Sequence, residues 1–558
     1  MYADNIEVVK IGSMRLFKAL IDELKIVETI NNNVNWDQKQ WKISPGNLIA
    51  AILLSIFYGN RVLYKLDEFY EEQDLELLFG VDGLTAESFN DDCLGRALDR
   101  LAEGNPQVVF GTAVLNAKKA HGFSTSICHA DTTTFQVYGE YEQEDGWDPD
   151  PFVVARGYNK QGDYELKQFK LGLATNHEGI PIFGEPLSGN MDDKTWSKTF
   201  LEYLPELEPV LKDDAILIVD SAAMTEDTLR MTREGVRLIS RLPETFALCG
   251  ELKREALASG AWQPVDSLDE KRNADYRVQC FERELAGGRY HFVVVESKVL
   301  ALARGKTIDR AVTREGVALE KAFASLAKEC FPSREAAEAV WHERLKQLAP
   351  IYHTPAYGIT EAAAKPKRGR PGRPAKGENP PAERYYSISA TAGAPDAAKV
   401  ESAKALSGLF VLFSSAGDLA ADEVLGLYKG RPYIENRFAF LKDPRFVGPV
   451  YLKLPGRIEA LCYVMLLALL VYSLFERRVR EGLRAEGKSY RVAGSYKTMR
   501  PSGKTLLAAL EGMSIIKKYG LNGVKRLLPR NVNKKAQQIV RYCGFDIGIY
   551  VQPPNSGT

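Results

Sequence analysis

The apolar residues of this chain change their spacing at about residue 115, and this change decides which elements the chain can form. Before it, the segments 14–30 and 45–70 repeat apolar side chains at every third and fourth position, which is typical of amphipathic helices. After it, the segments 124–141 and 166–187 are rich in β-branched and aromatic residues and contain turn residues. We therefore predict a helical N-terminal module over residues 1–115, followed by strands.

The strands beyond residue 115 predict a mixed sheet. Asn176, Gly179 and Pro181 mark a turn, so the segment around them should hold two neighbouring antiparallel strands. A helical stretch comes next, and then AILIVDSAA (215–223), a continuous apolar run typical of a strand that is buried on both faces. Residues 116–250 are therefore expected to form the first part of an α/β core.

The remaining chain divides into three further segments. Residues 251–415 contain a strand-like hairpin, two helical stretches and a basic linker at 365–382, which is too rich in Gly and Pro to bury a core. We interpret them as an α+β domain inserted into the sheet. A helical pattern over 416–486 should complete the core, and 487–558 form a basic C-terminal region.

The charge of the chain is balanced in total but uneven along its length. It has 73 basic and 73 acidic residues among 558, a length that calls for several domains. Residues 67–103 contain twelve acidic and two basic residues, whereas residues 477–541 contain seventeen basic and three acidic ones. This excess of positive charge favours contact with phosphate groups over a merely solvated surface.

The cysteines and the most apolar segment bear on the environment of the protein. The seven cysteines form no CxxC pair, so they indicate neither a disulfide framework nor a zinc site, and they fit a reducing cytoplasm. The N-terminus lacks the pattern of a secretory signal. The apolar run 460–475 is shorter than a bilayer span needs, so we expect a buried core helix and no membrane partner.

Two acids lie where a charge is costly. Asp131 is part of a neutral, β-prone stretch, and Asp220 ends the apolar run at 215–223. A carboxylate beside a buried strand needs compensation, which a divalent cation supplies most simply. Either Asp alone is more often a turn or cap residue, and a lone Glu435 is more often an exposed helix residue. The metal interpretation therefore depends on their combination.

The segment 428–442, YKGRPYIENRFAFLK, has helical spacing with an interruption. Proline is tolerated in the first turn of a helix but not in its interior, so we predict a new helix that begins near Pro432. Tyr428 then lies on the preceding turn. Glu435 and Lys442 are seven positions apart and fall within about 20° of the same helix face.

The spacing of this segment resembles a family signature. Tyr428, Arg431, Glu435 and Lys442 match the pattern of Tyr, two residues, Arg, three residues, Glu, six residues and Lys. This pattern is the YREK signature of the IS-four superfamily of insertion-sequence DDE transposases. The stretches HADTTTF and ILIVDSAA resemble the two Asp-bearing strands of that family.

The resemblance implies a ribonuclease-H-like mixed-sheet core interrupted by the inserted domain. It implies that Asp131, Asp220 and Glu435 are the catalytic, metal-binding acids, which hold Mg²⁺, two ions being expected, with Mn²⁺ as a substitute. Tyr428, Arg431 and Lys442 would bind the DNA of the element end. The bases around Glu435, with Arg437 among them, are expected to face phosphates.

The function that the resemblance implies is cut-and-paste DNA transposition. The enzyme would cleave at the ends of an insertion sequence and transfer the 3′ hydroxyl into target DNA. Its partner would be double-stranded DNA, namely the terminal inverted repeats and the target, and it would act as a homodimer in the DNA complex. It would work in the prokaryotic cytoplasm, associated with the nucleoid when bound, and the N-terminal helices would bind DNA. Two alternatives remain, a ribonuclease-H-like nuclease or resolvase without strand transfer and a catalytically inactive DNA-binding regulator derived from a transposase.

Two further segments have both a functional and a structural interpretation. Residues 368–374, RGRPGRP, resemble an AT-hook core, in which Arg368, Arg370 and Arg373 would enter the minor groove. The alternative is a solvated linker. The stretch SGNMDDKTW (188–196) is most simply a turn, so Asp192 and Asp193 are expected to be mainly structural.

Overall fold

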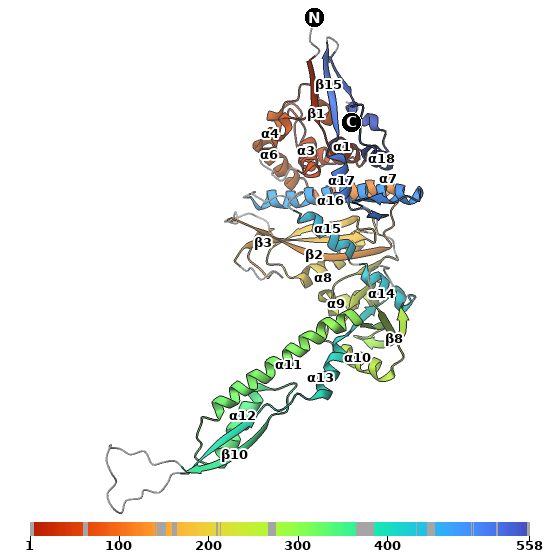
Figure 1. Cartoon of the computed structure of the whole chain (residues 1–558). Coiled ribbons are helices and arrows are strands. Elements are labelled where there is room, and N and C mark those ends of the chain that lie inside the picture. The colour runs from red at the N-terminus through yellow and green to blue at the C-terminus, as the bar shows by residue number, and fades with distance from the viewer. Residues whose placement is uncertain are drawn as a thin grey trace, which may run out of the picture.

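The computed structural model describes most of the chain. The described residues are 5–59, 65–139, 141, 152–158, 165–207, 210–211, 214–265, 275–363, 384–430, 432–443, 452, 454–492, 494, 496–520 and 523–554. The elements of both ends of the chain lie together at one end of the molecule, a large sheet follows, and an arm extends from the other end (Figure 1).

The described residues of the N-terminal part form helices and the single strand β1, and the helices agree with the spacing of the apolar residues. The start of α3 shows the local cause, because the Ser44 side chain accepts a hydrogen bond from the Asn47 N–H at 3.2 Å and Pro45 occupies the first helical position. The elements are β1 (Asn5–Lys10), α1 (Met14–Glu23), α2 (Ile26–Asn33), α3 (Pro45–Tyr58), α4 (Leu66–Glu71), α5 (Leu75–Phe79), α6 (Asp91–Glu103) and α7 (Pro106–His121).

The large sheet is mixed, as predicted. Its first strands are β2 (Ile127–Val137), β3 (Lys167–Asn176), β4 (Pro181–Leu187), β5 (Ile216–Ile218) and β6 (Arg237–Arg241). In the order β4-β3-β2-β5-β6, the strands β2, β3 and β4 pair antiparallel, and β5 and β6 run parallel to β2. The predicted turn joins β3 to β4. Gly179 adopts a φ of 78° there, which is a conformation that favours glycine.

Strands from the segment predicted as an insertion continue the same sheet beyond β6. They are β12 (Leu409–Ser414), β9 (Gly288–Ser297), β8 (Tyr276–Leu285) and β7 (Gln263–Val265), all paired antiparallel. The hairpin β8–β9 turns at Ala286 and Gly287, where both φ values are positive as a tight hairpin turn requires. This segment therefore shares a sheet with the core instead of forming a wholly separate body.

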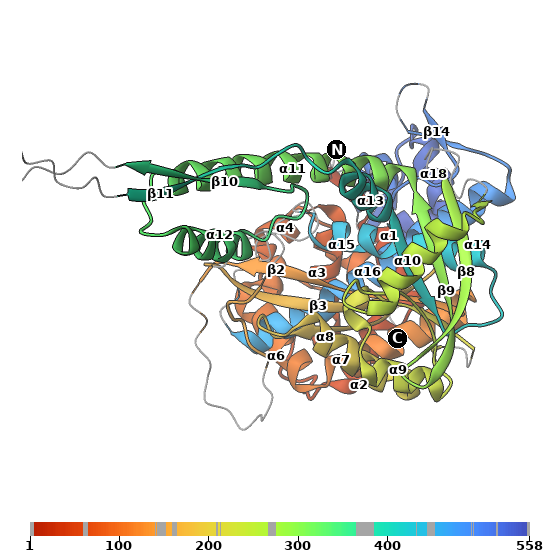
Figure 2. The same ribbon diagram turned by 90° about the horizontal axis from the view of Figure 1, so that it is seen from below.

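The rest of that segment forms the arm. It consists of α11 (Lys298–Leu326), α12 (Arg334–Leu348), β10 (Ala356–Ala363) and β11 (Arg384–Thr391), and α13 (Ala397–Ser407) leads back to the sheet. The arm has a small hydrophobic cluster of its own, which contains Phe323, Trp341 and Ile388. Figure 2 shows these elements extending away from the sheet.

Helix α16 (Pro455–Ala485) lies in the centre of the molecule, between the sheet and the helices of the N-terminal part (Figure 1). Every residue from Ala460 to Phe475 is buried. Within the described ranges, α16 is the one helix whose length and apolar composition would suffice to cross a membrane, and 94% of its apolar window is buried inside the protein. This burial agrees with the predicted core helix, although the helix is longer than the predicted run.

The C-terminal elements pack on the N-terminal ones. They are β13 (Tyr490–Arg491), β14 (Lys497–Thr498), α17 (Gly503–Leu510), β15 (Ser514–Gly520), β16 (Gly523–Leu527) and α18 (Lys534–Tyr542). Strand β15 pairs with both β1 and β16, and the Tyr550 hydroxyl donates a hydrogen bond to the carbonyl of Gly12 at 3.0 Å. The two ends of the chain, which the sequence predicted as separate modules, therefore share a sheet and a hydrophobic core.

Candidate active site

Asp131 and Asp220 lie on neighbouring parallel strands. Asp131 is part of β2, and Asp220 follows the end of β5. The register of these strands places His129 opposite Ile218. Two residues further along each strand, the same register brings Asp131 level with Asp220, on the face of the sheet that His129 also occupies. Both aspartates are half-buried.

Each of these carboxylates also has a local structural contact. The Asp131 side chain accepts a hydrogen bond from the Thr132 N–H at 2.9 Å. The Asp220 side chain accepts one from the Ser221 N–H at 2.8 Å and caps the short 3₁₀ helix that follows. The cap role, which the sequence left open for either Asp, is therefore present for Asp220, whereas Asp131 lies within a strand and caps no element.

The break in the segment 428–442 falls where the sequence predicted it. Helix α14 (Ala421–Lys429) ends before Gly430, and α15 (Pro432–Leu441) begins at the proline. Tyr428 consequently belongs to α14. Its ring lies 6.4 Å from the ring of Phe410 on β12, in a hydrophobic cluster of the sheet.

Helix α15 runs alongside β2. A Cβ atom placed on Gly430 would lie 3.2 Å from Nε2 of His129, so the start of the helix is close to His129. At the other end, Nζ of Lys442 lies 5.6 Å from the centroid of the Phe135 ring. His129 and Phe135 point to the same side of β2, since they are an even number of residues apart. Helix α15 therefore covers the face of β2 that bears Asp131.

The position of Glu435 along α15 follows from the contact of Lys442 with Phe135. Seven residues of helix cover about 10.5 Å from Lys442 back to Glu435. Four residues of strand cover about 13 Å from Phe135 back to Asp131. Glu435 is therefore near the level of Asp131, and it shares a helix face with Lys442, which reaches β2. Both side chains on this helix face are exposed.

The opposite face of the sheet is covered by α8 (Asp193–Glu202), as Figure 1 shows. Asp193 accepts a hydrogen bond from the Thr132 hydroxyl at 2.9 Å and pairs with Lys170 at 3.0 Å. Asp192 caps the helix by accepting a hydrogen bond from the Lys194 N–H at 2.6 Å. Both aspartates have the structural roles that the sequence favoured, on the side of β2 away from Asp131.

Arg437 does not face phosphates, so this expectation was wrong. Its guanidinium pairs with Glu476 of α16 at 2.7 Å, and its Nε donates to the carbonyl of Gly179 at 2.7 Å. The Arg437 and Glu476 side chains are 6% and 5% exposed. The helical period contained the signal, because Arg437 lies on the same face of α15 as Ile434 and Leu441, which are both buried.

This buried ion pair locks α15 onto α16 and onto the turn between β3 and β4. Arg480 also approaches Glu476, at 3.3 Å. Burial alone would raise the pKa of Glu476, but the charges of Arg437 and Arg480 outweigh it and hold the pKa below its usual value. Glu476 therefore stays ionised inside the core, where it fixes the position of the helix that carries Glu435.

Some predicted site residues lie outside the described residues. These are Arg431 and the three arginines of the AT-hook-like segment, Arg368, Arg370 and Arg373. Their roles in DNA binding stay predictions.

The acids have the chemistry of a magnesium site without forming a closed one. Among the described residues, no group of three or more His, Cys, Asp or Glu side chains is arranged to hold a metal ion. Asp131, Asp220 and Glu435 nevertheless offer the carboxylate oxygens that Mg²⁺ prefers, from rigid elements on one face of the sheet. The donor set fits the ion, and its side chains would have to converge when the ion binds.

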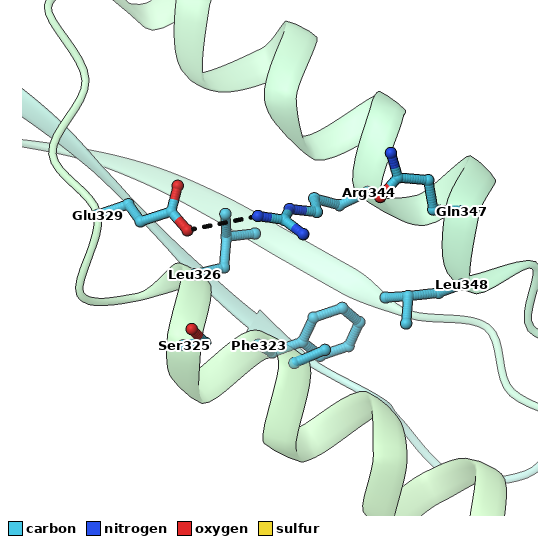
Figure 3. A pocket seen from close by; sticks show the side chains of 8 residues that line it. Phe323, Ser325, Leu326, Glu329, Arg344, Gln347 and Leu348 are labelled. Carbon is cyan, nitrogen blue, oxygen red and sulfur yellow. Dashed lines mark ion pairs between the residues drawn. The ribbon is translucent and has the colours of Figure 1, made fainter.

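The arm contains a small cavity, remote from these acids. It has a volume of about 160 Å³ and lies between α11 and α12 (Figure 3). Phe323, Leu326 and Leu348 supply its apolar lining, and Arg344 faces Glu329 at 3.9 Å. None of the candidate acids lines this cavity.

A family model and solved structures match this chain. Residues 6–115, the N-terminal helical part, match the family model described as a domain of unknown function (DUF4277). No curated protein matches the chain. A cryo-EM structure of a piggyBac transposase synaptic complex with hairpin DNA is similar at 10% identity, over 98% of this chain and 87% of that chain, with a TM-score of 0.38. A match at this level carries no argument about function.

Proposed function

We propose that the protein is a DDE transposase, which cuts DNA at the ends of a mobile element and joins the freed 3′ hydroxyl to target DNA. The observation that carries this proposal is that the elements bearing three acids lie on one face of the sheet, close enough for their carboxylates to converge on a bound ion. The register of β2 and β5 brings Asp131 level with Asp220, and α15 carries Glu435 along the same face. The strand order β4-β3-β2-β5-β6 supports a ribonuclease-H-like core around them.

Asp131, Asp220 and Glu435 would hold Mg²⁺, with Mn²⁺ as a substitute, through their carboxylate oxygens. The bound ions would supply an activated water and stabilise the oxygen that leaves the phosphodiester. The three carboxylates lie on elements whose relative positions are fixed by the fold. Sheet pairing fixes the two aspartates, and the Arg437–Glu476 ion pair fixes the helix of Glu435.

Double-stranded DNA would approach the exposed side of α15. Lys442 would contact a phosphate near the scissile bond, since it is exposed and shares a helix face with Glu435. Tyr428 would contribute to end binding from α14, and Arg431 from the link between the two helices. A homodimer would process the two element ends in the cytoplasm, and the N-terminal helices and the AT-hook-like segment would add further DNA contacts.

The proposal is tested with purified protein, Mg²⁺, a labelled duplex from the DNA that flanks its gene, and a target plasmid. Wild type should yield joined products, whereas Asp131→Asn and Asp220→Asn should yield neither cleavage nor joining. Asp192→Asn is the matched control. It lies on the other side of the sheet, and an asparagine keeps the helix cap, so it should behave as wild type.

Two other outcomes would overturn the proposal. Metal-dependent cleavage by wild type without joined products would assign a nuclease or resolvase. Sequence-selective binding without any cleavage, under Mg²⁺ or Mn²⁺, would assign a DNA-binding regulator.

A further inference from the structure

The sheet formed by β1, β15 and β16 projects from the end of the molecule farthest from the arm (Figure 1). Its two faces carry different charges. Because side chains alternate along a strand and directly opposed residues share a face, the strand register assigns every residue to one face or the other.

The inner face is electrically neutralised. Lys517 lies opposite Arg526 on this face. Arg526 pairs with Asp74 at 2.7 Å and with Glu76 at 2.8 Å, and Lys517 pairs with Glu7 at 3.5 Å. Each base on this face thus has an acidic partner, and these pairs attach the sheet to the helices beneath it.

The outer face repeats the opposed bases without the acids. Lys518 lies directly opposite Lys525, one residue along from the neutralised pair. Lys10 lies on the same face toward the other end of β1, opposite Ser514. None of these three lysines forms an ion pair with any carboxylate of the described chain. The other side chains of this face are apolar or uncharged, namely Ile6, Val8, Ser514, Ile516 and Leu527.

Like charges directly opposite each other destabilise a sheet, so the outer face bears a cost that the inner face has removed. The apolar side chains of Ile6 and Val8 add to this cost, because they are 53% and 67% exposed to solvent on the same face. Lys10 is about 13 Å along the strands from Lys518, at four residues of about 3.3 Å each. Duplex DNA carries one negative charge per about 1.7 Å of axis, so several phosphates fall within this length.

We propose that the outer face of the β1–β15–β16 sheet binds the phosphate backbone of double-stranded DNA. This inference rests on the proposed function for the choice of DNA as the polyanion. It adds a contact surface on the other side of α16 from α15 (Figure 1). Strands from both ends of the chain form this surface. It also separates the basic C-terminal residues into those that hold the fold together and those that are available to a partner.

The test measures binding of the full-length protein to a labelled 40-base-pair duplex of arbitrary sequence over a series of KCl concentrations. In the variant Lys10→Ala/Lys518→Ala/Lys525→Ala, the negative slope of log K against log salt should become less steep, by about 0.9 for each lost phosphate contact. Lys488→Ala is the control, since Lys488 is an exposed C-terminal lysine already paired with Glu486 at 2.8 Å, and its slope should equal that of wild type. The thermal midpoint of the triple variant should equal or exceed that of wild type, because a repulsion has been removed.

An unchanged slope in a folded triple variant would overturn the inference. If that variant also lost binding to vesicles rich in anionic phospholipid, the face would instead be assigned to a membrane surface. A reduced slope in a protein that cleaves no DNA would retain this surface and reject the transposase proposal. The two proposals can therefore fail separately.

Discussion

The two faces of α15 use similar charges for different purposes. On one face Arg437 is buried between Ile434 and Leu441 and is paired with Glu476. On the other face Glu435 and Lys442 are exposed beside β2. These bases lie within five positions of each other, so the type of residue does not separate the structural charge from the available one. The phase of the helix does.

The sheet formed by β1, β15 and β16 shows the same division of its bases, but with the two-residue period of a strand. Lys517 and Lys518 are neighbours in sequence, and only Lys517 meets carboxylates. In both places a basic cluster in the sequence resolves into bases that stabilise the fold and bases that remain available. The following predictions challenge this division on α15 and its partner α16.

The largest effect is expected from Glu435→Gln. If the exposed face of α15 is catalytic, loss of a metal-binding carboxylate should remove several kcal/mol of transition-state stabilisation, roughly a thousandfold in cleavage rate. The thermal midpoint should stay that of wild type, since Glu435 is exposed. Asn436→Ala changes the exposed neighbour and should cut normally. Normal cleavage by Glu435→Gln would remove this face from the site.

The buried face should respond in stability. Glu476→Gln leaves the guanidinium groups of Arg437 and Arg480 without their buried carboxylate, which should cost about 3–5 kcal/mol in urea unfolding. Glu481→Gln changes a half-buried acid on the same helix, whose pair with Arg477 lies near the surface, and should leave the urea midpoint nearly unchanged. Adding Arg437→Met to Glu476→Leu should recover part of the loss. A Glu476→Gln protein as stable as wild type would contradict a locking role for the pair.

The stability difference between wild type and Glu476→Gln should depend on pH. The pKa of Glu476 is lower in the folded protein than its ordinary value of 4.5. The ionised carboxylate therefore contributes its stability above the unfolded pKa, and the contribution is lost as the pH falls through the folded pKa. Thermal midpoints of the two proteins should be well separated near pH 6 and converge as the pH falls well below about 4.5. A separation independent of pH would show that the charge of Glu476 does not contribute.

The smallest effect is expected from Lys442→Ala. Losing one phosphate contact should lower the slope of log K against log salt by about 0.9, with a modest loss of duplex affinity. Lys194→Ala is its counterpart on the opposite side of the sheet, where α8 lies, and should leave the slope unchanged. Equal slopes for Lys442→Ala and wild type would mean that Lys442 does not touch DNA.

Much of the local structure could be predicted from the sequence. The change of apolar spacing near residue 115 separated helices from strands, and Pro432 marked the start of α15. The turn at Gly179 followed from residues that tolerate positive φ. The face shared by Glu435 and Lys442 followed from helical geometry alone. For the candidate site, the sequence supplied the three acids and predicted that two of them lie on or beside strands, and the parallel register then brought these two level.

The long-range partners could not be predicted in this way. The sequence by itself determined where helices and strands begin and turn, because these depend on backbone preferences and on the period of the apolar residues. Only the tertiary structure decided that β1 pairs with β15 and that Arg437 meets Glu476, 39 positions away. Such partners are chosen by burial and by the pairing of charges across the folded core, which no local spacing encodes.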